Sequence, residues 1–430
     1  MIKKIFISIL PSRVFSKLKS IYYFRYTLSK YAEKAKKADY SRWKPGEVYY
    51  REIKNFDLLI YDTSFPNSIS GFRFAEFNAL LKEFRNIKII VNPTDYPQSD
   101  QKTKTHKTDI LHLKKTNPVS YRKTFAGTVK DIKNTKLFYC IFLNNMYDSL
   151  PYVEKNKISF IFTLYPGGGF DVKDETALRK LKAVLSSEYF RGVIVTQQFT
   201  QDFIVKEYHC PEDKILNIFG CLVPQNSIGT GRSRRFKHTM TLNVCFCAAR
   251  YTEIGADKGY DIFIETAKML VSKGYDIHFH IIGDYDDKII SIEGFEKFFT
   301  FYGLKRFEEL QPIFLEQDVI LSPNRPFILN IGSFDGFPLG TVVEAVLNGA
   351  VPVVTDELKQ NIVFSDEEVI IVRPDAEEIA SKIENLIHDP EVLNFISEKS
   401  QKKFREIYSD DYQLKKRIDF IKKHLYDTRN

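Results

Sequence analysis

Short apolar strand-like runs alternate with amphipathic helical stretches in both halves of the 430-residue sequence. Predicted first-half strands lie at residues 56–62, 87–93, 137–143, 159–166, 192–197 and 215–223, and predicted helices at 72–84, 174–190 and 199–209. Predicted second-half strands lie at 243–250, 277–284, 319–323, 351–356 and 369–374, and predicted helices at 259–274, near 292–302, at 341–348 and at 376–389. Strands separated by helices of this length indicate parallel sheets with crossover helices. We therefore predict an α/β protein of two doubly wound, Rossmann-like domains that face each other across a cleft.

Composition shifts along the chain suggest where the domains begin and end. Residues 1–45 form a basic amphipathic segment, 46–225 the first domain, 226–240 a polar linker, 241–408 the second domain, and 409–430 a helix returning toward the first domain. The polar stretch 94–135 carries few strand or helix signals, and we expect an inserted loop region there.

Positive charge is concentrated at the start of the chain. Residues 1–45 carry 12 Lys and Arg against two acids, a net charge of +10, whereas the whole chain carries +8. The remainder is thus slightly acidic, which argues against a nucleic-acid-binding protein. Apolar residues interleave with the lysines of this segment, a mixture that suits an anionic membrane surface. An ordinary basic helix packed on the first domain fits equally well.

Several classes of site are disfavoured by what the sequence lacks. The five cysteines form no C-x-x-C pair, which is typical of a reduced, cytoplasmic chain. His278 and His280 have no third ligand nearby, and Asp284 and Asp286 follow a predicted strand directly and are expected to form a turn, so we predict no metal site and no cofactor. No apolar run is long enough to span a membrane. No G-x-G-x-x-G follows a predicted strand, which disfavours a nicotinamide-dependent enzyme.

The stretch "FDGFPLGTVVEAVLNGAVPVVTDE" (334–357) carries the strongest site signal. Gly340 and Thr341 stand where a short helix begins, and the free N–H groups of a helix N-terminus suit a phosphate. Glu344, one turn further on, is placed to accept hydrogen bonds from paired sugar hydroxyls. Asp335 and Gly336 lie on the preceding loop, at the strand ends where doubly wound folds gather ligands. Together these features predict a nucleotide-sugar binding corner.

This stretch resembles the acid–Gly–Phe … Glu–Ala signature of retaining glycosyltransferases with the GT-B fold, of the family 4 type. "CAARYTEIGADKGYDIFIETAKML" followed by "HFHIIGD" resembles the Arg … Lys–Gly segment of the same family, and "GVIVTQQFTQDFIVKEYHCPEDKILNIFGCLVP" resembles the last βαβ unit of its acceptor domain. The resemblance covers residues 190–360 and is weak over 50–190. It implies that the second domain binds the donor and the first domain the acceptor.

The resemblance also implies roles for four charged residues. Asp335 would contact the donor sugar, Glu344 would hold the ribose, and Arg250 and Lys258 would neutralise the pyrophosphate. Eight residues separate Asp335 from Glu344, one more than in the family, and the first acid is Asp in place of Glu. The two cations have a physical rationale of their own, because a departing nucleoside diphosphate gathers negative charge that fixed cations stabilise.

The remaining predicted site residues lie on loops that follow predicted strands. Donor contacts are expected from Gly71, Arg73, Gly283, Asp284, Gly336, Phe337, Leu339, Gly340 and Thr341, with Ser70 beside the first two. On the acceptor side we expect Tyr165, Gly167 and Gly168, from the loop "LYPGGGFD". A histidine that the family often carries near this loop is absent.

The function predicted from these residues is transfer of a sugar, with retention of configuration, from a nucleoside diphosphate sugar to a glycan or lipid-linked acceptor. A growing surface glycan on a lipid carrier fits the basic segment 1–45, with the protein cytoplasmic or peripheral on the inner face of the membrane. Two alternatives stay open at this point: a nucleotide-sugar epimerase or hydrolase of the same fold, and a catalytically inactive, transferase-like scaffold subunit. The sequence indicates neither the nucleotide base nor the sugar.

Overall fold

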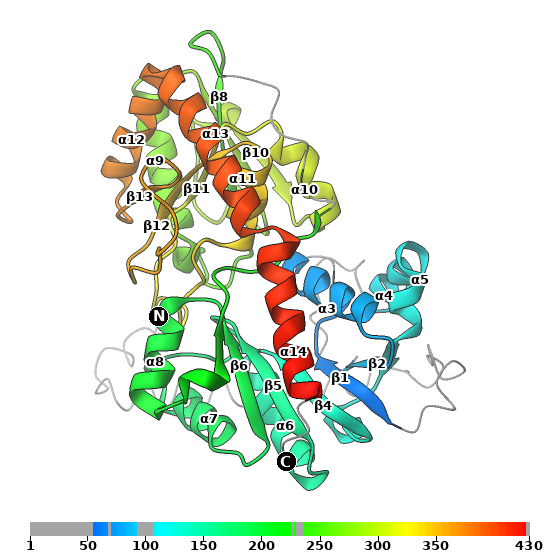
Figure 1. Cartoon of the computed structure of the whole chain (residues 1–430). Coiled ribbons are helices and arrows are strands. Elements are labelled where there is room, and N and C mark those ends of the chain that lie inside the picture. Colours follow the sequence, from blue (N-terminus) through cyan, green and yellow to red (C-terminus); the bar gives the residue numbers. More distant parts are fainter. Residues whose placement is uncertain (1–54, 68–69, 93–105, 226–227, 229–235, 427–430) are drawn as a thin grey trace, which may run out of the picture.

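Two α/β domains make up the computed structural model, which describes residues 55–67, 70–92, 106–225, 228 and 236–426 (Figure 1). Each contains one parallel sheet, and the strand orders are β3-β2-β1-β4-β5-β6-β7 and β10-β9-β8-β11-β12-β13. In both sheets the order of the strands reverses beside the first strand of the domain, which is the doubly wound arrangement. The predicted fold class is confirmed. The basic segment 1–45 lies outside the described residues, as does most of the predicted linker.

The first domain is built from seven strands and the helices between them. The strands are β1 (Phe56–Asp62), β2 (Ile87–Val91), β3 (Thr124–Ala126), β4 (Thr135–Ile141), β5 (Ser159–Leu164), β6 (Phe190–Val195) and β7 (Ile215–Asn217). The helices are α3 (Gly71–Glu83), α4 (His106–Thr116), α5 (Pro118–Arg122), α6 (Leu143–Lys155), α7 (Glu175–Leu185) and α8 (Gln198–Tyr208). Apolar residues of α6, α7 and α8 pack on one face of the sheet, and those of α3 and α4 pack on the other.

The second domain repeats this plan with six strands. The strands are β8 (Leu242–Cys247), β9 (Ile277–Ile282), β10 (Phe299–Gly303), β11 (Val319–Ser322), β12 (Val351–Thr355) and β13 (Ile370–Val372). The helices are α9 (Tyr260–Ser272), α10 (Phe307–Phe314), α11 (Gly340–Leu347), α12 (Ala376–His388) and α13 (Pro390–Ile407). Helices α9 and α12 cover one face and α10 and α11 the other. Every residue of β12 is buried, as the apolar run of a central parallel strand requires.

A final helix, α14 (Lys416–Tyr426), lies over the first sheet although it follows the second domain in sequence (Figure 1). Its apolar residues Phe420, Ile421 and Leu425 belong to the same core cluster as β1, β2 and β4. The chain therefore crosses between the domains twice, before β8 and before α14.

Two expectations about local structure were wrong. The described part of stretch 94–135 is not a loop: it contains α4, α5 and the short edge strand β3, which are polar because few of their residues face the core. The helix expected near 292–302 is instead a loop with one 3-10 turn (Glu296–Phe298) followed by strand β10, and the helix α10 comes after it. Aromatic residues crowd this segment and mimic a helical pattern, but Phe299 pairs in register with Phe279 of β9.

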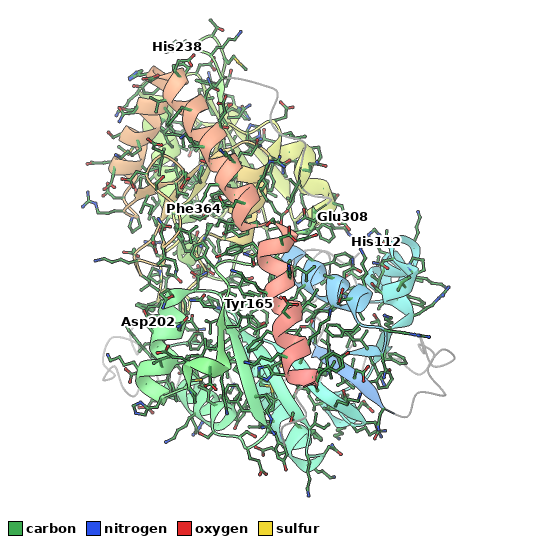
Figure 2. All side chains as sticks on the ribbon, in the orientation of Figure 1. His112, Tyr165, Asp202, His238, Glu308 and Phe364 are labelled. Atoms are coloured by element: carbon green, nitrogen blue, oxygen red, sulfur yellow. The ribbon has the colours of Figure 1, made fainter. Side chains whose placement is uncertain are left out.

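The two domains touch along the cleft through side chains of α3, α4 and α10. The rings of Phe74 and Phe307 have centroids 5.0 Å apart, and Arg306 Nη2 lies 3.1 Å from Asp109 Oδ1. His112 and Glu308 lie beside each other across the same boundary, 3.3 Å between Nε2 and Oε1 (Figure 2). These contacts close the cleft on the side where α3 and α4 meet α10.

Candidate active site

A large cavity lies between the domains, where the carboxyl ends of both sheets meet. Its volume is about 1050 Å³, and residues from loops after β1, β4, β5, β6, β8, β9 and β11 line it. The carboxyl ends of parallel strands are where open α/β sheets bind ligands. The predicted site residues that line it are Ser70, Gly71, Arg73, Tyr165, Gly167, Gly168, Arg250, Lys258, Gly283, Asp284, Asp335, Gly336, Leu339, Gly340, Thr341 and Glu344.

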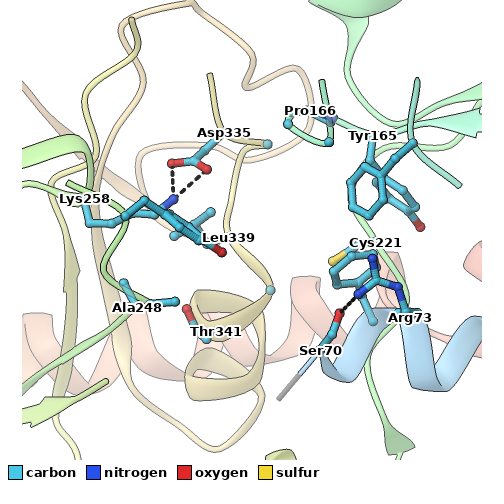
Figure 3. A pocket seen from close by; sticks show the side chains of 18 of the residues that line it. Ser70, Arg73, Tyr165, Pro166, Cys221, Ala248, Lys258, Asp335, Leu339 and Thr341 are labelled. Atoms are coloured by element: carbon cyan, nitrogen blue, oxygen red, sulfur yellow. Dashed lines mark hydrogen bonds and ion pairs between the residues drawn. The ribbon is translucent and has the colours of Figure 1, made fainter. Parts of the chain in front are cut away.

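Lys258 and Asp335 form an ion pair in the second-domain wall of the cavity (Figure 3). Lys258 Nζ lies 2.7 Å from each carboxylate oxygen of Asp335, and Asn324 Nδ2 donates to Oδ2, also at 2.7 Å. Burial of Lys258 opposes protonation, but the Asp335 carboxylate outweighs it and raises the pKa of the ammonium group. The lysine is thus a fixed cation in the cavity wall.

A tight turn after β8 fixes the position of this lysine. The turn Ala256–Lys258 ends at Gly259, whose φ is 70°. A Cβ atom on Gly259 would lie 2.0 Å from the carbonyl oxygen of Pro323, so only glycine fits there. The backbone therefore brings Lys258 directly against the loop that follows β11.

Arg250 lies near the start of the loop that follows β8, and backbone atoms hold its side chain. Its Nε donates to the Asp284 carbonyl at 3.1 Å and its Nη1 to the Glu253 carbonyl at 2.9 Å. Its own backbone N–H donates to Asp284 Oδ1 at 2.7 Å. The backbone carbonyl of Asp284 thus orients the Arg250 guanidinium, while the Asp284 carboxylate binds the Arg250 backbone N–H. The guanidinium charge is therefore not neutralised by that carboxylate.

The N-terminus of α11 faces the cavity, and Glu344 lies within the same helix. Thr341 Oγ1 donates to the Cys247 carbonyl at 2.8 Å, which ties the helix start to the end of β8. The first N–H groups of a helix have no partner within it, so this end offers donors and a partial positive charge. Glu344 is 4% exposed, and a Cβ atom on Gly71 would lie 3.2 Å from its Oε1. The start of α3 in the first domain therefore approaches Glu344 of the second.

In the first-domain wall, Arg73 is engaged by neighbours on its own domain. Its Nε lies 3.1 Å from Asp62, and its Nη1 donates to Ser70 Oγ at 3.1 Å (Figure 3). Asp62 is fully buried and also accepts from the backbone N–H groups of Ser64 and Phe65, at 2.7 Å each. Arg73 therefore stabilises the loop after β1 through Nε and Nη1, and it also lines the cavity, so its predicted contact with the donor stays a prediction.

Aromatic rings line the rest of this wall. Tyr165 stacks edge-on against Phe72, with ring centroids 5.1 Å apart, and lies 5.8 Å from Phe142. Its hydroxyl donates to Glu76 at 2.8 Å, away from the cavity, and burial raises its pKa well above the usual value. Gly167 and Gly168 continue the wall with positive φ angles. Tyr165 thus lines the cavity while its hydroxyl is engaged by Glu76.

One predicted contact residue lies elsewhere, and two residues that the structure connects to the site were not among those predicted. The ring of Phe337 is buried in the second-domain core and does not line the cavity. Gln197 lines the cavity from the end of β6, and Asn324, which bonds to Asp335, follows β11. Gln197 is the last residue of the predicted strand 192–197, and Asn324 directly follows the predicted strand 319–323, so their position at strand ends would have identified them.

The described residues contain no group of three or more His, Cys, Asp or Glu side chains placed to hold a metal ion. Asp286 accepts from the backbone N–H groups of Lys288 and Ile289, so it forms the predicted turn. His280 bonds to Tyr302 and Asn243, and burial lowers its pKa to about 4.

Among the described residues, no helix has the length and apolarity needed to cross a membrane.

The second domain is similar in sequence to a family of glycosyltransferases. Residues 243–389, from β8 to the end of α12, match the sequence profile of the family described as glycosyl transferases group 1. A search of curated proteins found no match.

Solved structures share the two-domain fold at low sequence identity. The chain is similar to HepE from Anabaena in complex with UDP and glucose, with a TM-score of 0.62, 12% identity, and coverage of 85% of this chain and 97% of HepE. It is also similar to sucrose-phosphate synthase from Thermosynechococcus elongatus, with a TM-score of 0.58, 14% identity, and coverage of 82% and 95%. The outer-core galactosyltransferase WaaB follows with a TM-score of 0.51, 13% identity, and coverage of 86% and 98%. The fold is that of GT-B glycosyltransferases. With the matched profile, it supports the prediction that the chain is a glycosyltransferase.

Proposed function

We propose that the protein transfers a sugar from a nucleoside diphosphate sugar to a glycan or lipid-linked acceptor, with retention of configuration. The observation that carries the proposal is the buried cation Lys258, which lies in the same cavity wall as Arg250 and the N-terminus of α11. Fixed cations and helix N–H groups stabilise the negative charge that develops on a departing diphosphate. Retention is implied by the resemblance to family 4 glycosyltransferases.

Each part of the donor has a proposed binding group in the second domain. Arg250 and Lys258 bind the diphosphate, and Glu344 accepts hydrogen bonds from the ribose hydroxyls. Asp335 contacts the donor sugar, which lies between the domains. HepE, which has the same fold, is described in complex with UDP-glucose, and we propose a uridine diphosphate sugar as the first donor to test.

The acceptor is proposed to enter along the first-domain wall. Tyr165 and Phe72 offer ring faces and edges, on which the C–H faces of a sugar pack well. The loop Gly167–Gly168 lets an acceptor approach the backbone closely. The basic segment 1–45 is proposed to bring the protein to an anionic membrane that carries a lipid-linked acceptor.

Nucleotide release tests this function against its two alternatives. The purified chain is incubated with UDP-, GDP-, CDP- and dTDP-sugars, with and without a mixture of lipid-linked glycan acceptors, and the released nucleotide is quantified. Release that requires the acceptor is the expected result. Release without acceptor would indicate hydrolysis or epimerisation, and protein that binds none of these sugars would indicate a scaffold.

A further inference from the structure

The loop of residues 334–338, which carries the proposed sugar-contacting carboxylate, is packed into both domains. The ring of Phe334 is 5% exposed and lies against Phe170 and Phe199 of the first domain, with centroids 5.6 and 5.1 Å away. Phe337, three residues later, is buried in the core of the second domain. Asp335 therefore stands on a segment whose two ends are anchored in different domains.

Two buried glutamines donate to the backbone of this loop, one from each domain. Gln197 Nε2 of the first domain donates to the Phe337 carbonyl at 3.2 Å, and Gln360 Nε2 of the second donates to the Asp335 carbonyl at 3.0 Å. A Cβ atom on Gly336 would lie 3.1 Å from Gln197 Nε2, so the glutamine and the loop fit closely. Only the nitrogen of an amide donates to a carbonyl, so the acceptor fixes the orientation of each side chain.

Gln197 projects from a rigid junction of the first domain. It lies between β6, which ends at Val195, and α8, which begins at Gln198. Its own carbonyl accepts from the backbone N–H groups of Thr200 and Gln201, at 3.1 and 3.2 Å. Its position relative to the first sheet is therefore set by the backbone, and the loop is located relative to that sheet.

Stability of the fold alone does not account for this residue. Gln197 is 2% exposed, and its Oε1 has no hydrogen-bond partner among the residues that the structure describes. A buried amide oxygen without a partner costs free energy, and methionine of the same length would avoid that cost. The hydrogen bond to the loop is the contribution that methionine would not replace.

We propose that Gln197 is a positioning residue that fixes Asp335 against the donor sugar. Through it, the first domain controls sugar binding at a site that the second domain supplies. The inference rests on the proposed function, in which Asp335 contacts the donor sugar while the diphosphate binds to Arg250 and Lys258. It follows that loss of the Gln197 bond weakens binding of the sugar part of the donor and not of the nucleotide part.

The test compares the affinities for UDP-glucose and UDP in the full chain, by titration calorimetry. The variant Gln197→Met is expected to lose affinity for UDP-glucose about tenfold, the effect of one lost hydrogen bond of ordinary strength, while its affinity for UDP stays within about twofold. Gln360→Met, which removes the other amide bond to the loop, should do the same. The melting temperature of Gln197→Met should stay close to that of the wild type, because the substitution removes the unpaired Oε1 together with the donor to the buried Phe337 carbonyl.

A matched control is available in Gln317, which is also fully buried, donates to a backbone carbonyl at 3.0 Å and leaves its Oε1 without a partner in the described residues. It lies outside the cavity lining, so Gln317→Met should leave both affinities unchanged. Gln197→Glu keeps an oxygen and loses the donor, and it should bind UDP-glucose no better than Gln197→Met. Recovery of wild-type affinity by Gln197→Glu would overturn the inference, because the oxygen would then contact the sugar directly.

Asp335→Asn separates failure of this inference from failure of the proposed function. A selective loss of UDP-glucose binding in Asp335→Asn with no loss in Gln197→Met would overturn the positioning role alone. An equal loss of UDP and UDP-glucose affinity in Gln197→Met would overturn it as well. Wild-type protein that binds neither UDP, UDP-glucose nor any other nucleotide sugar of the panel would overturn the proposed function and this inference with it.

Discussion

The two walls of the cavity differ in how their charged side chains are compensated. In the first-domain wall Arg73 pairs with Asp62, whose side chain is wholly buried and is held by two backbone N–H groups as well. In the second-domain wall Lys258 pairs with Asp335, whose side chain is 33% exposed. The carboxylate of the first pair is closed to a ligand, whereas the carboxylate of the second remains accessible from the cavity.

This difference indicates what each wall contributes to the chemistry. Separating a buried ion pair costs several kcal/mol, so the contact between Arg73 and Asp62 stabilises the fold. Lys258 and Asp335 face the cavity. There the diphosphate of a donor would replace part of the contact that Lys258 makes with Asp335, and the donor sugar would replace part of the contact that Asp335 makes with Lys258. The second wall therefore supplies charge, and the first supplies shape through Phe72, Tyr165 and the glycine loop.

The largest effect is expected from removing the cation of the second wall. Lys258→Ala should lower kcat by about 100- to 1000-fold, because a fixed positive charge beside a developing diphosphate is lost. Steady-state rates with saturating donor and acceptor measure this. Lys268→Ala, a lysine on α9 that donates to the Ser291 carbonyl outside the cavity lining, is the control and should retain wild-type kcat. A rate for Lys258→Ala within threefold of wild type would contradict the assignment.

A smaller effect, on stability rather than on donor binding, is expected in the first wall. Tyr165→Phe removes the hydroxyl that donates to the buried Glu76, and the free energy of unfolding should fall by about 1–3 kcal/mol. The affinity for UDP should not change, since the ring remains. Urea titration and calorimetry measure the two quantities.

Tyr251 provides the matched control for that substitution. It also lines the cavity, but it is 63% exposed, so Tyr251→Phe should leave the free energy of unfolding unchanged. If Tyr165→Phe lowered UDP affinity as much as stability, the division between a charged wall and a shaping wall would be wrong.

Strands and helices could be predicted from the sequence where a local pattern of residues determines them, and could not be predicted where tertiary contacts do. Doubly wound sheets were predictable, because buried parallel strands such as β12 read as continuous apolar runs. Strand β10 was not, because Phe299 and its aromatic neighbours satisfy a helical pattern as readily as a strand, and only pairing with β9 decides. The short helices of the 94–135 stretch carry too few buried residues to show a period.

The residues of the candidate site also differ in whether local sequence or contacts between distant segments determine their role. Lys258 was predicted from its resemblance to a family segment, and Asp335 and Glu344 from that resemblance and from the loop and short helix on which they stand; the structure brings all three to one cavity. The engagement of Arg73 by Asp62 spans 11 residues and was not visible in sequence, and the bond from Gln197 to Phe337 spans 140. Contacts between distant segments decide which polar residues are left to meet a ligand.

The smallest effect is expected where the walls meet, at the ion pair between Asp109 and Arg306. Its side chains are 4% and 16% exposed, and the pair joins α4 of the first domain to the start of α10 in the second. Asp109→Asn, Arg306→Gln and the double variant form a cycle in which the coupling energy for UDP-glucose binding should be about 1 kcal/mol or less, because partial solvation limits the strength of such pairs. The coupling should shrink in high salt, since screening weakens it.

The neighbouring pair His112 and Glu308, each about one third exposed, should give a smaller coupling in the same assay. Strictly additive effects of Asp109→Asn and Arg306→Gln would mean that this contact does not help to close the cleft, and the packing of Phe74 on Phe307 and of the 334–338 loop would then have the larger part in holding the two walls together.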